Sequence, residues 1–134
     1  MEKKFFAMAR RNATLSDFDR IHIGCVAVYK GKVISMGHNT QKTHPTQKIY
    51  NGYRQLVNEE AMHHSIHAEM MCLNKLSERI PTNKIKLYVY RIRRDIPHGM
   101  ARPCPACMAK IKELGIKNIY YTTDDGYAYE KITI

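Results

Sequence analysis

The sequence predicts an α/β fold, a three-layer α/β/α sandwich with a five-stranded mixed sheet. Three observations support this class. Helix-like segments alternate with strand-like segments in the second half of the chain, as is typical of a sheet covered by helices. Five short runs are rich in the β-branched and aromatic residues that favour strands. Only about four residues link the last two runs, whereas a parallel return needs a dozen or more, so we expect this pair to be antiparallel.

The first expected element is an amphipathic helix close to the N-terminus. Its apolar residues recur at helical spacing between Phe5 and Leu15, and Arg10 and Arg11 should face solvent. A pair of strands follows within residues 21–39. Its β-branched residues favour strand, and a Lys-Gly-Lys sequence in the middle supplies the turn.

Residues 40–64 lack any periodicity and read as a long, polar and basic loop. Apolar residues then return at helical spacing and predict a helix over residues 65–79, which should end before Pro81. Residues 84–94 alternate and are rich in Tyr, Val and Ile, so they predict a strand.

The remaining elements complete the order α-β-β-α-β-α-β-β. Residues 95–103 read as a loop and residues 104–114 as a helix, which Gly115 should terminate. Strands follow in residues 116–123 and near the C-terminus, and the Asp-Gly pair between them is a hairpin signal.

Length and composition suit a single domain covering residues 1–134, since 134 residues with 44% hydrophobic content can form a core of ordinary size. The chain has no apolar run of about 18 residues, so we expect no membrane span, and its N-terminus does not resemble a secretory signal. Four cysteines in a chain of this length do not indicate a disulfide framework. We therefore expect a reducing, cytoplasmic location.

The formal net charge is +10, from 22 Lys and Arg against 12 Asp and Glu. Such an excess favours partners that carry phosphate, although a basic surface that only aids solubility is an equally valid interpretation. Basic residues are concentrated in and around the loop before the last helix, at Lys84, Lys86, Arg91, Arg93, Arg94 and Arg102.

Two cysteines, Cys104 and Cys107, open the predicted helix of residues 104–114, and three interpretations compete for them. The first is a thiol redox pair, because a helix N-terminus favours thiolate. The second is a closed structural zinc site, which Cys25 and Cys72 would have to complete. The third is a zinc site with three protein ligands and one open position.

The third interpretation gains support from the start of the preceding predicted helix, where His67-Ala68-Glu69 stands. If both helices direct their N-termini to one place, His67 and the two cysteines converge. Residues two apart do not share a helix face, so Glu69 suits a proton carrier beside the metal better than a ligand. A first-turn glutamate that only stabilises the helix dipole is the alternative.

The combination of H-x-E with the later P-C-x-x-C, Pro103 to Cys107, is similar to the signature of the cytidine deaminase superfamily. The resemblance extends from about Gly24 to Tyr121 and implies that family's five-stranded mixed sheet between helices. It implies one zinc ion per chain. It also implies roles for individual residues: His67, Cys104 and Cys107 as ligands, Glu69 as the catalytic proton carrier, and Ala68 and Asn39 as substrate contacts. Arg102, directly before Pro103, is a further candidate substrate contact, because a basic residue in this loop could hold a phosphate; a solvated surface residue is the alternative.

The resemblance predicts a hydrolase of nucleotide metabolism that converts the cytosine of cytidine, deoxycytidine or deoxycytidylate to uracil with release of ammonia. The alternative is a deaminase of cytosine or adenine in single-stranded DNA or RNA, which the net charge favours. An antiparallel last pair of strands resembles the free-nucleoside branch, whereas the long loop and the P-C-P-A-C sequence resemble the nucleotide branch. The family also implies a homo-oligomer. A redox protein and a non-catalytic zinc fold remain open from the residues alone.

Overall fold

A five-stranded sheet forms the centre of the computed structural model, which describes residues 2–17, 21–42, 44–54, 66–96 and 98–133. The strand order is β2-β1-β3-β4-β5. Only β3 and β4 are paired in parallel; the other three pairs are antiparallel. The mixed sheet predicted from the sequence is therefore confirmed. The strands are β1 (His22–Tyr29), β2 (Lys32–His38), β3 (Lys86–Ile92), β4 (Asn118–Thr122) and β5 (Tyr127–Lys131).

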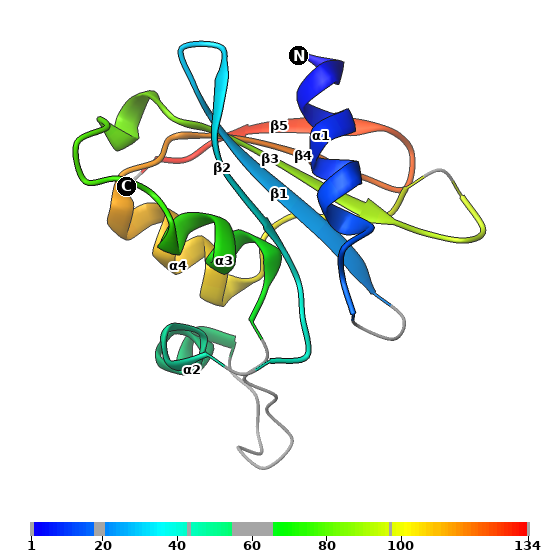
Figure 1. Ribbon diagram of the computed structural model, residues 1–134, viewed down its shortest axis with the longest axis horizontal. Helices are drawn as coiled ribbons and strands as arrows, with labels where there is room; N and C mark the ends of the chain where they lie inside the picture. The colour runs from blue at the N-terminus through cyan, green and yellow to red at the C-terminus, as the bar shows by residue number, and fades with distance from the viewer. Residues whose placement is uncertain (1, 18–20, 43, 55–65, 97, 134) are drawn as a thin grey trace.

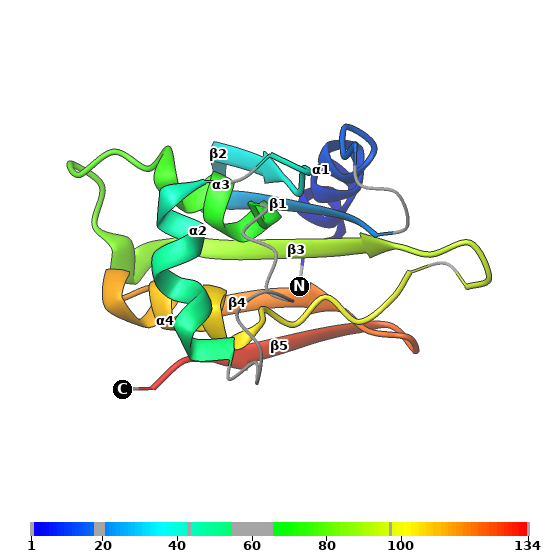
Figure 2. The ribbon, with the colours of Figure 1, turned by 90° about the horizontal axis from the view of Figure 1, so that it is seen from below.

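Helices cover both faces of this sheet. Helix α1 (Lys3–Ala13) lies on one face, and α3 (Ala68–Asn74) and α4 (Pro105–Leu114) lie together on the other (Figure 1). Seen from below, the short helix α2 (Pro45–Tyr50) crosses in front of α3 and α4, outside the sheet (Figure 2). The arrangement is the three-layer α/β/α sandwich expected from the sequence.

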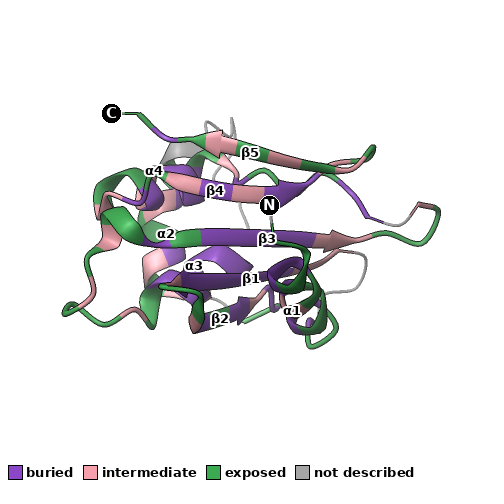
Figure 3. Cartoon of the chain, turned by 90° about the horizontal axis from the view of Figure 1, so that it is seen from above, coloured by how far each residue is buried: buried purple, intermediate pink, exposed green. Residues whose placement is uncertain are grey.

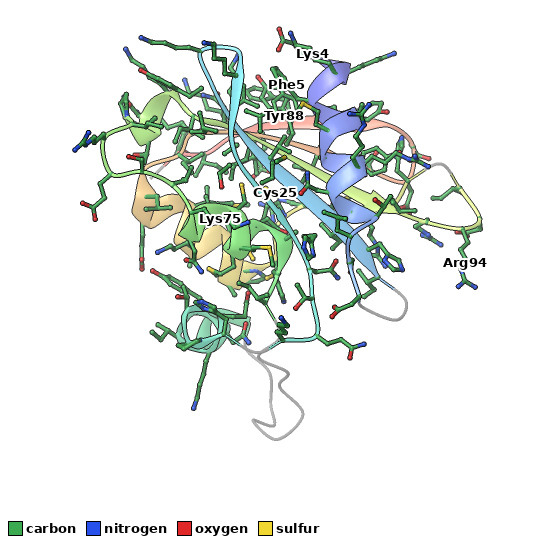
Figure 4. All side chains as sticks on the ribbon, viewed as in Figure 1. Lys4, Phe5, Cys25, Lys75, Tyr88 and Arg94 are labelled. Carbon is green, nitrogen blue, oxygen red and sulfur yellow. The ribbon has the colours of Figure 1, made fainter. Side chains whose placement is uncertain are left out.

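Helix α1 is held on the sheet by an aromatic and aliphatic cluster. Phe5, Phe6 and Ala9 are buried against Val26 and Tyr88 of the sheet, and Phe5 and Tyr88 are labelled side by side in Figure 4. The view from above shows buried residues on the inner side of α1 and exposed residues on its outer side (Figure 3). Exposed Arg10 and Arg11 follow the predicted orientation. Leu15 lies beyond the helix end and is 63% exposed, contrary to its assignment to the apolar face.

A second core fills the opposite face, between the sheet and the helix pair α3 and α4. Close contact between α3 and strand β2 depends on Gly37, because a Cβ atom there would lie 2.4 Å from the backbone oxygen of Ala68. The fully buried members of this core are contributed by the strands, by both helices and by the connections between them, and include Cys25, Cys72, Ile85, Leu87, Val89, Ile111 and Ile119.

The predicted turns are present with the expected chemistry. Lys30 and Gly31 both have positive φ, 51° and 76°, as two-residue hairpin turns require. Gly115 ends α4 at φ 82°, the left-handed conformation typical of a terminating glycine. The link from β4 to β5 is closed by a 2.8 Å hydrogen bond from the backbone N–H of Thr123 to the oxygen of Gly126, and the two strands are antiparallel as predicted.

Two predicted segments differ from the structure. Residues 40–64 are not simply a loop, since they contain α2 and a 3-10 turn, Asn51–Arg54; residues 55–65 lie outside the described part of the chain. The helix predicted over residues 65–79 is shorter, Ala68–Asn74. Leu76 and Ile80 continue the apolar pattern because they pack on the core from the turn after the helix. No helix in the described ranges is long and apolar enough to cross a bilayer.

Candidate active site

His67 stands at the N-terminus of α3, where it is the N-cap residue with extended backbone, φ −80° and ψ 158°. Backbone hydrogen bonds fix the residue before it, from the N–H of Ile66 to the oxygen of Lys42 at 2.9 Å and from the N–H of Thr40 to the oxygen of Ile66 at 3.2 Å. The His67 N–H donates to the side-chain oxygen of Gln47 at 3.0 Å. These hydrogen bonds fix the backbone of Ile66 and the N–H of His67, and thereby the position from which the imidazole extends.

Cys104 occupies the same position on α4, as its N-cap residue with φ −67° and ψ 168°. Pro105 follows at the first helical position, where its missing N–H removes no helix hydrogen bond. Cys107 comes three residues after Cys104, so both thiols lie on one face of the helix. The prediction that both helices begin at these chemically active residues is confirmed.

The loop before Cys104 is tied to strand β4. The hydroxyl of Thr122 donates to the oxygen of Gly99 at 2.7 Å, and the N–H of Ala101 donates to the oxygen of Thr122 at 2.9 Å. His98, in the same loop, contacts the chain just after β4, where its Nδ1 lies 2.7 Å from the backbone oxygen of Thr123. These bonds set the path of the chain into α4 and thereby the place of Cys104.

The three predicted ligands meet. Nδ1 of His67 lies 3.4 Å from Sγ of Cys104 and 3.4 Å from Sγ of Cys107, and all three atoms lie within 4.8 Å of one another. Zn–S and Zn–N distances of about 2.3 and 2.0 Å around a tetrahedral ion place neighbouring sulfur and nitrogen atoms about 3.5 Å apart. This donor set and spacing therefore fit zinc, with three protein ligands in the described part of the chain.

The pKa values of the two thiols are shifted in opposite directions. A hydrogen bond from the Cys107 thiol, assisted by His67, lowers the pKa of Cys104 to about 4 against the opposing effect of its burial. The pKa of Cys107 is raised well above its usual value, first because its thiol donates that bond and second because it is buried. Cys104 is therefore prepared as a thiolate, whereas Cys107 depends on a cation to lose its proton.

Glu69 is the second residue of α3, after Ala68, and is only 4% exposed. Its Oε1 atom is buried and has no hydrogen-bond partner among the residues the structure describes. Burial raises the pKa of this carboxyl group, and the nearby His67 opposes the rise. Its side chain interacts with the Cys107 thiol, which places the carboxyl group beside the triad.

Apolar side chains close the inner side of the centre. Ile66, Met70 and Cys107 form one buried cluster, against which Tyr50 and Met71 pack. Thiolate ligands in such surroundings are shielded from water on that side. An open pocket of about 530 Å³ lies next to α3, and its lining includes Ile66, His38, Lys42, Met71 and Lys75; Lys75 is labelled in Figure 4.

The expected substrate contacts are engaged with protein partners. The side-chain amide of Asn39 makes two hydrogen bonds to the backbone. Nδ2 donates to the oxygen of Ile21 at 2.8 Å, and Oδ1 accepts from the N–H of Ile23 at 2.9 Å. Arg102 forms a bidentate pair with Glu130 of β5, with both N–O distances 2.9 Å. Ala68 is the first residue of α3 and is buried. Their contacts with substrate stay predictions.

The other two cysteines do not belong to this centre. Cys25 and Cys72 are fully buried in the hydrophobic core, and neither is part of the ligand cluster. The closed site with four cysteine ligands, considered from the sequence, is therefore not formed. Figure 4 shows Cys25 on the sheet.

Sequence reasoning missed two polar residues that support the site. Gln47 and Asn51 are both fully buried, and Nε2 of Gln47 donates to Oδ1 of Asn51 at 2.8 Å. Both lie in the segment read as a polar loop. Only the His44-Pro45 pair, an N-cap and first-turn proline, signals the helix that carries Gln47.

Comparisons with known proteins agree with this geometry. The family model of the cytidine and deoxycytidylate deaminase zinc-binding region matches residues 1–123. The chain is 31% identical over 104 residues to the tRNA-specific adenosine deaminase subunit tad2 of Schizosaccharomyces pombe (strain 972 / ATCC 24843), a match that covers 75% of this chain and 20% of that protein. The chain thus spans about a fifth of the length of this curated relative.

Solved structures show the same fold. The dCMP deaminase of cyanophage S-TIM5 in its apo form superposes with a TM-score of 0.60 at 23% identity, over 90% of this chain and 81% of that one. The cytidine deaminase of Burkholderia pseudomallei superposes with a TM-score of 0.64 at 15% identity, over 98% and 92% of the two chains. The imidazole and two thiols form the zinc-binding His/Cys/Cys triad typical of this family. The chain belongs to the cytidine and deoxycytidylate deaminase zinc-binding family.

Proposed function

We propose that this chain catalyses hydrolytic deamination of a base in single-stranded RNA, with adenine as the base. The observation that carries this proposal is its 31% identity to a tRNA-specific adenosine deaminase subunit. This reverses the order of preference drawn from the sequence, where free cytosine nucleosides and nucleotides came first. The net charge of +10 also supports a polyanionic substrate.

The residues of the site divide the chemistry among them. Bound zinc would supply Lewis acidity that lowers the pKa of a water molecule toward neutrality. His67, Cys104 and Cys107 would hold the ion by one nitrogen and two sulfur atoms. The buried Oε1 atom of Glu69 would accept a proton from the attacking water and return it to the departing amine. Adenine and water would give hypoxanthine and ammonia.

The neighbouring residues would orient the base. Ala68 lies between the ligand His67 and the proton carrier Glu69, so its backbone N–H is placed at the start of α3, where a helix favours an electronegative group. Asn39 holds residues 21 and 23 and would act on substrate through the position of this segment. Arg102 would contact a phosphate while its guanidinium group is also paired with the carboxylate of Glu130.

Free cytosine nucleosides and nucleotides are the second candidate substrates. The observation in their favour is the antiparallel pairing of β4 with β5, which resembles the free-nucleoside branch of the family. The structural likeness to the dCMP and cytidine deaminases shows the fold and does not choose between these substrates.

A panel assay distinguishes the candidates. Purified, zinc-loaded protein is incubated with an RNA stem-loop holding one unpaired adenine, a matched stem-loop holding one unpaired cytosine, adenosine, cytidine, deoxycytidine and deoxycytidylate. Ammonia release and product analysis are measured, with Glu69→Ala as the inactive control. Inosine in the first RNA alone supports the proposal, whereas uracil products from free nucleosides or nucleotides alone would support the second candidate.

We further propose that residues 1–134 act as one deaminase domain, and that the working unit is a homo-oligomer in a reducing, cytoplasmic setting. Support for the last comes from the centre itself, because the free thiols on which it depends persist best where glutathione keeps them reduced. Light scattering coupled to gel filtration measures the number of subunits.

A further inference from the structure

A chain of two hydrogen bonds leads from Asn51 through Gln47 of helix α2 to the zinc ligand at the start of α3. Oε1 of Gln47 accepts from the backbone N–H of His67 at 3.0 Å, and Nε2 of Gln47 donates to Oδ1 of Asn51 at 2.8 Å. Gln47 and Asn51 have no exposed surface. Because burying an amide is unfavourable unless it is hydrogen-bonded, both side chains are fixed by these contacts.

The N–H of an N-cap residue has no partner in the hydrogen-bond ladder of its helix and needs another acceptor. In a capping box, a Glu or Gln side chain three residues later accepts from it. In α3 that position is Met70, which carries no such acceptor, and the His67 side chain makes no capping bond. Its ring nitrogen instead faces the two sulfur atoms. Gln47 thus supplies from another helix the acceptor that the sequence of α3 lacks.

The bond requires an amide at position 47. Its oxygen must face His67 and its NH₂ group must find an acceptor, which Asn51 provides one helical turn later. The Asn51 oxygen therefore fixes which way the Gln47 amide is turned. A side chain without an oxygen at this place would remove the acceptor that Gln47 gives to the His67 N–H.

Helix α2 is itself anchored to the helix that carries the sulfur ligands. The hydroxyl of Tyr50 contacts the carboxyl group of Glu113 on α4, and Nζ of Lys110 lies 5.3 Å from the centre of the Tyr50 ring. Tyr50 also packs on the cluster that contains Cys107. One short helix therefore touches both ligand-bearing helices, through Gln47 at the start of α3 and Tyr50 on α4. Figure 2 shows α2 crossing in front of both helices.

We propose that Gln47, braced by Asn51, is a positioning residue that holds His67 at the correct place and orientation to bind zinc. This inference rests on the zinc centre of the proposed function but not on the identity of the base. Partners outside the ligand set commonly change metal affinity by about 10- to 100-fold when they are removed. The loss expected on removing the Gln47 oxygen is within this range.

The test measures zinc affinity by competition with a chromophoric chelator, using the full chain. Gln47→Met keeps the length of the side chain and removes its polar atoms, so zinc should bind about 10- to 100-fold more weakly. Ile49→Met is the matched control, because this residue of the same helix is 73% exposed, and its zinc affinity should equal that of the unaltered protein.

Two further variants separate positioning from folding. Gln47→Glu keeps an oxygen that accepts from the His67 N–H, so zinc should bind more tightly to this variant than to Gln47→Met. Asn51→Ala should give an intermediate loss, and it tests the proposal even if Gln47→Met does not fold. The visible spectrum of the cobalt-substituted proteins reports the ligand geometry directly, and it should change in Gln47→Met and not in Ile49→Met.

The outcomes are distinct. Equal zinc affinity and equal cobalt spectra in Gln47→Met and Ile49→Met would overturn the positioning role and leave the zinc centre intact. An equal loss in Gln47→Glu and Gln47→Met would overturn it as well, because the acceptor oxygen would then not matter. Failure of the unaltered protein to bind zinc would instead refute the centre on which the whole inference depends.

Discussion

His67 caps the N-terminus of α3 and Cys104 caps that of α4, and the ring Nδ1 of the first lies 3.4 Å from the Sγ of the second. Two helices on one face of the sheet therefore begin at the same point. Each N-terminus carries partial positive charge, which favours thiolate at Cys104 and negative charge in the water that a metal would bind here. The geometry of the helix starts thus accounts for the chemistry of the centre.

Removal of one sulfur ligand should abolish metal binding. Loss of a residue that only supports a ligand weakens metal binding by up to about 100-fold. Cys104→Ser removes a ligand itself, so its zinc affinity should fall by much more than this, and the purified protein should be nearly free of zinc. The unaltered protein should gain about 4 kcal/mol of stability when free zinc is about 1,000 times Kd, and the variant should not. Zinc content by mass spectrometry and thermal unfolding with and without zinc measure both effects.

Cys72→Ala is the control for this experiment, because Cys72 lies on α3 within the core and outside the triad. Its zinc content should stay at one ion per chain. Loss of zinc from this variant would argue for a third sulfur ligand.

Replacement of Glu69 should separate catalysis from metal binding. Glu69→Gln preserves size and removes the group that carries the proton, so kcat should fall by about 10²- to 10⁴-fold while zinc content is unchanged. Glu78→Gln makes the same chemical change at an exposed residue just after α3 and should leave kcat as it was. A Glu69→Gln enzyme with normal kcat would show that another group moves the proton.

Two glycines offer a matched test of how α3 supports the centre. A Cβ atom on Gly37 would lie 2.4 Å from the oxygen of Ala68, and one on Gly24 would lie 2.0 Å from the oxygen of Ala9. Both alanine variants should lose about 1–3 kcal/mol of unfolding free energy, because each forces a helix away from the sheet. Only Gly37→Ala moves the helix that begins at the ligand His67, so only this variant should also bind zinc more weakly.

Urea unfolding and chelator competition measure the two quantities. Equal zinc affinities in the two glycine variants would show that the packing of α3 on β2 does not control the metal site.

We expect the folded protein to lose stability at alkaline pH because of the buried Tyr88. Burial, with a smaller effect from the neighbouring Tyr120, raises the pKa of Tyr88 to about 12, above the ordinary value of about 10. Because the folded state holds the proton more tightly, this contribution to stability is complete below about pH 10 and is lost as the pH rises toward about 12. Tyr88→Phe has no proton to lose.

The urea unfolding midpoint at about pH 8 and about pH 11 measures this effect, and the difference between the two should be smaller in Tyr88→Phe than in the unaltered protein. An equal fall in both proteins would assign the alkaline loss to other groups.

Most of the fold is visible in the sequence because its segments carry clear periodicities. The alternation in β3 and the terminating Gly115 predict their elements closely. The helix predicted over residues 65–79 is too long because Leu76 and Ile80 continue the apolar spacing from a turn. Side-chain burial and helical backbone are separate properties, and periodicity reports only the first.

Helix α2 could not be predicted in the same way. The residue it buries is the polar Gln47, whereas Ile49 is 73% exposed, so it has no apolar stripe. The three zinc ligands were predictable, since their types and spacing are tied to the metal. The support from Gln47 and Asn51 was not, because it depends on a contact between residues 20 apart in the sequence that no local pattern encodes.

X-ray absorption at the zinc edge of the purified protein tests the central claim most directly. The structure predicts two sulfur ligands at about 2.3 Å and two lighter ligands at about 2.0 Å, one of them the His67 imidazole and the other a molecule from solvent. Three or four sulfur ligands, or none, would contradict a catalytic centre built from His67, Cys104 and Cys107.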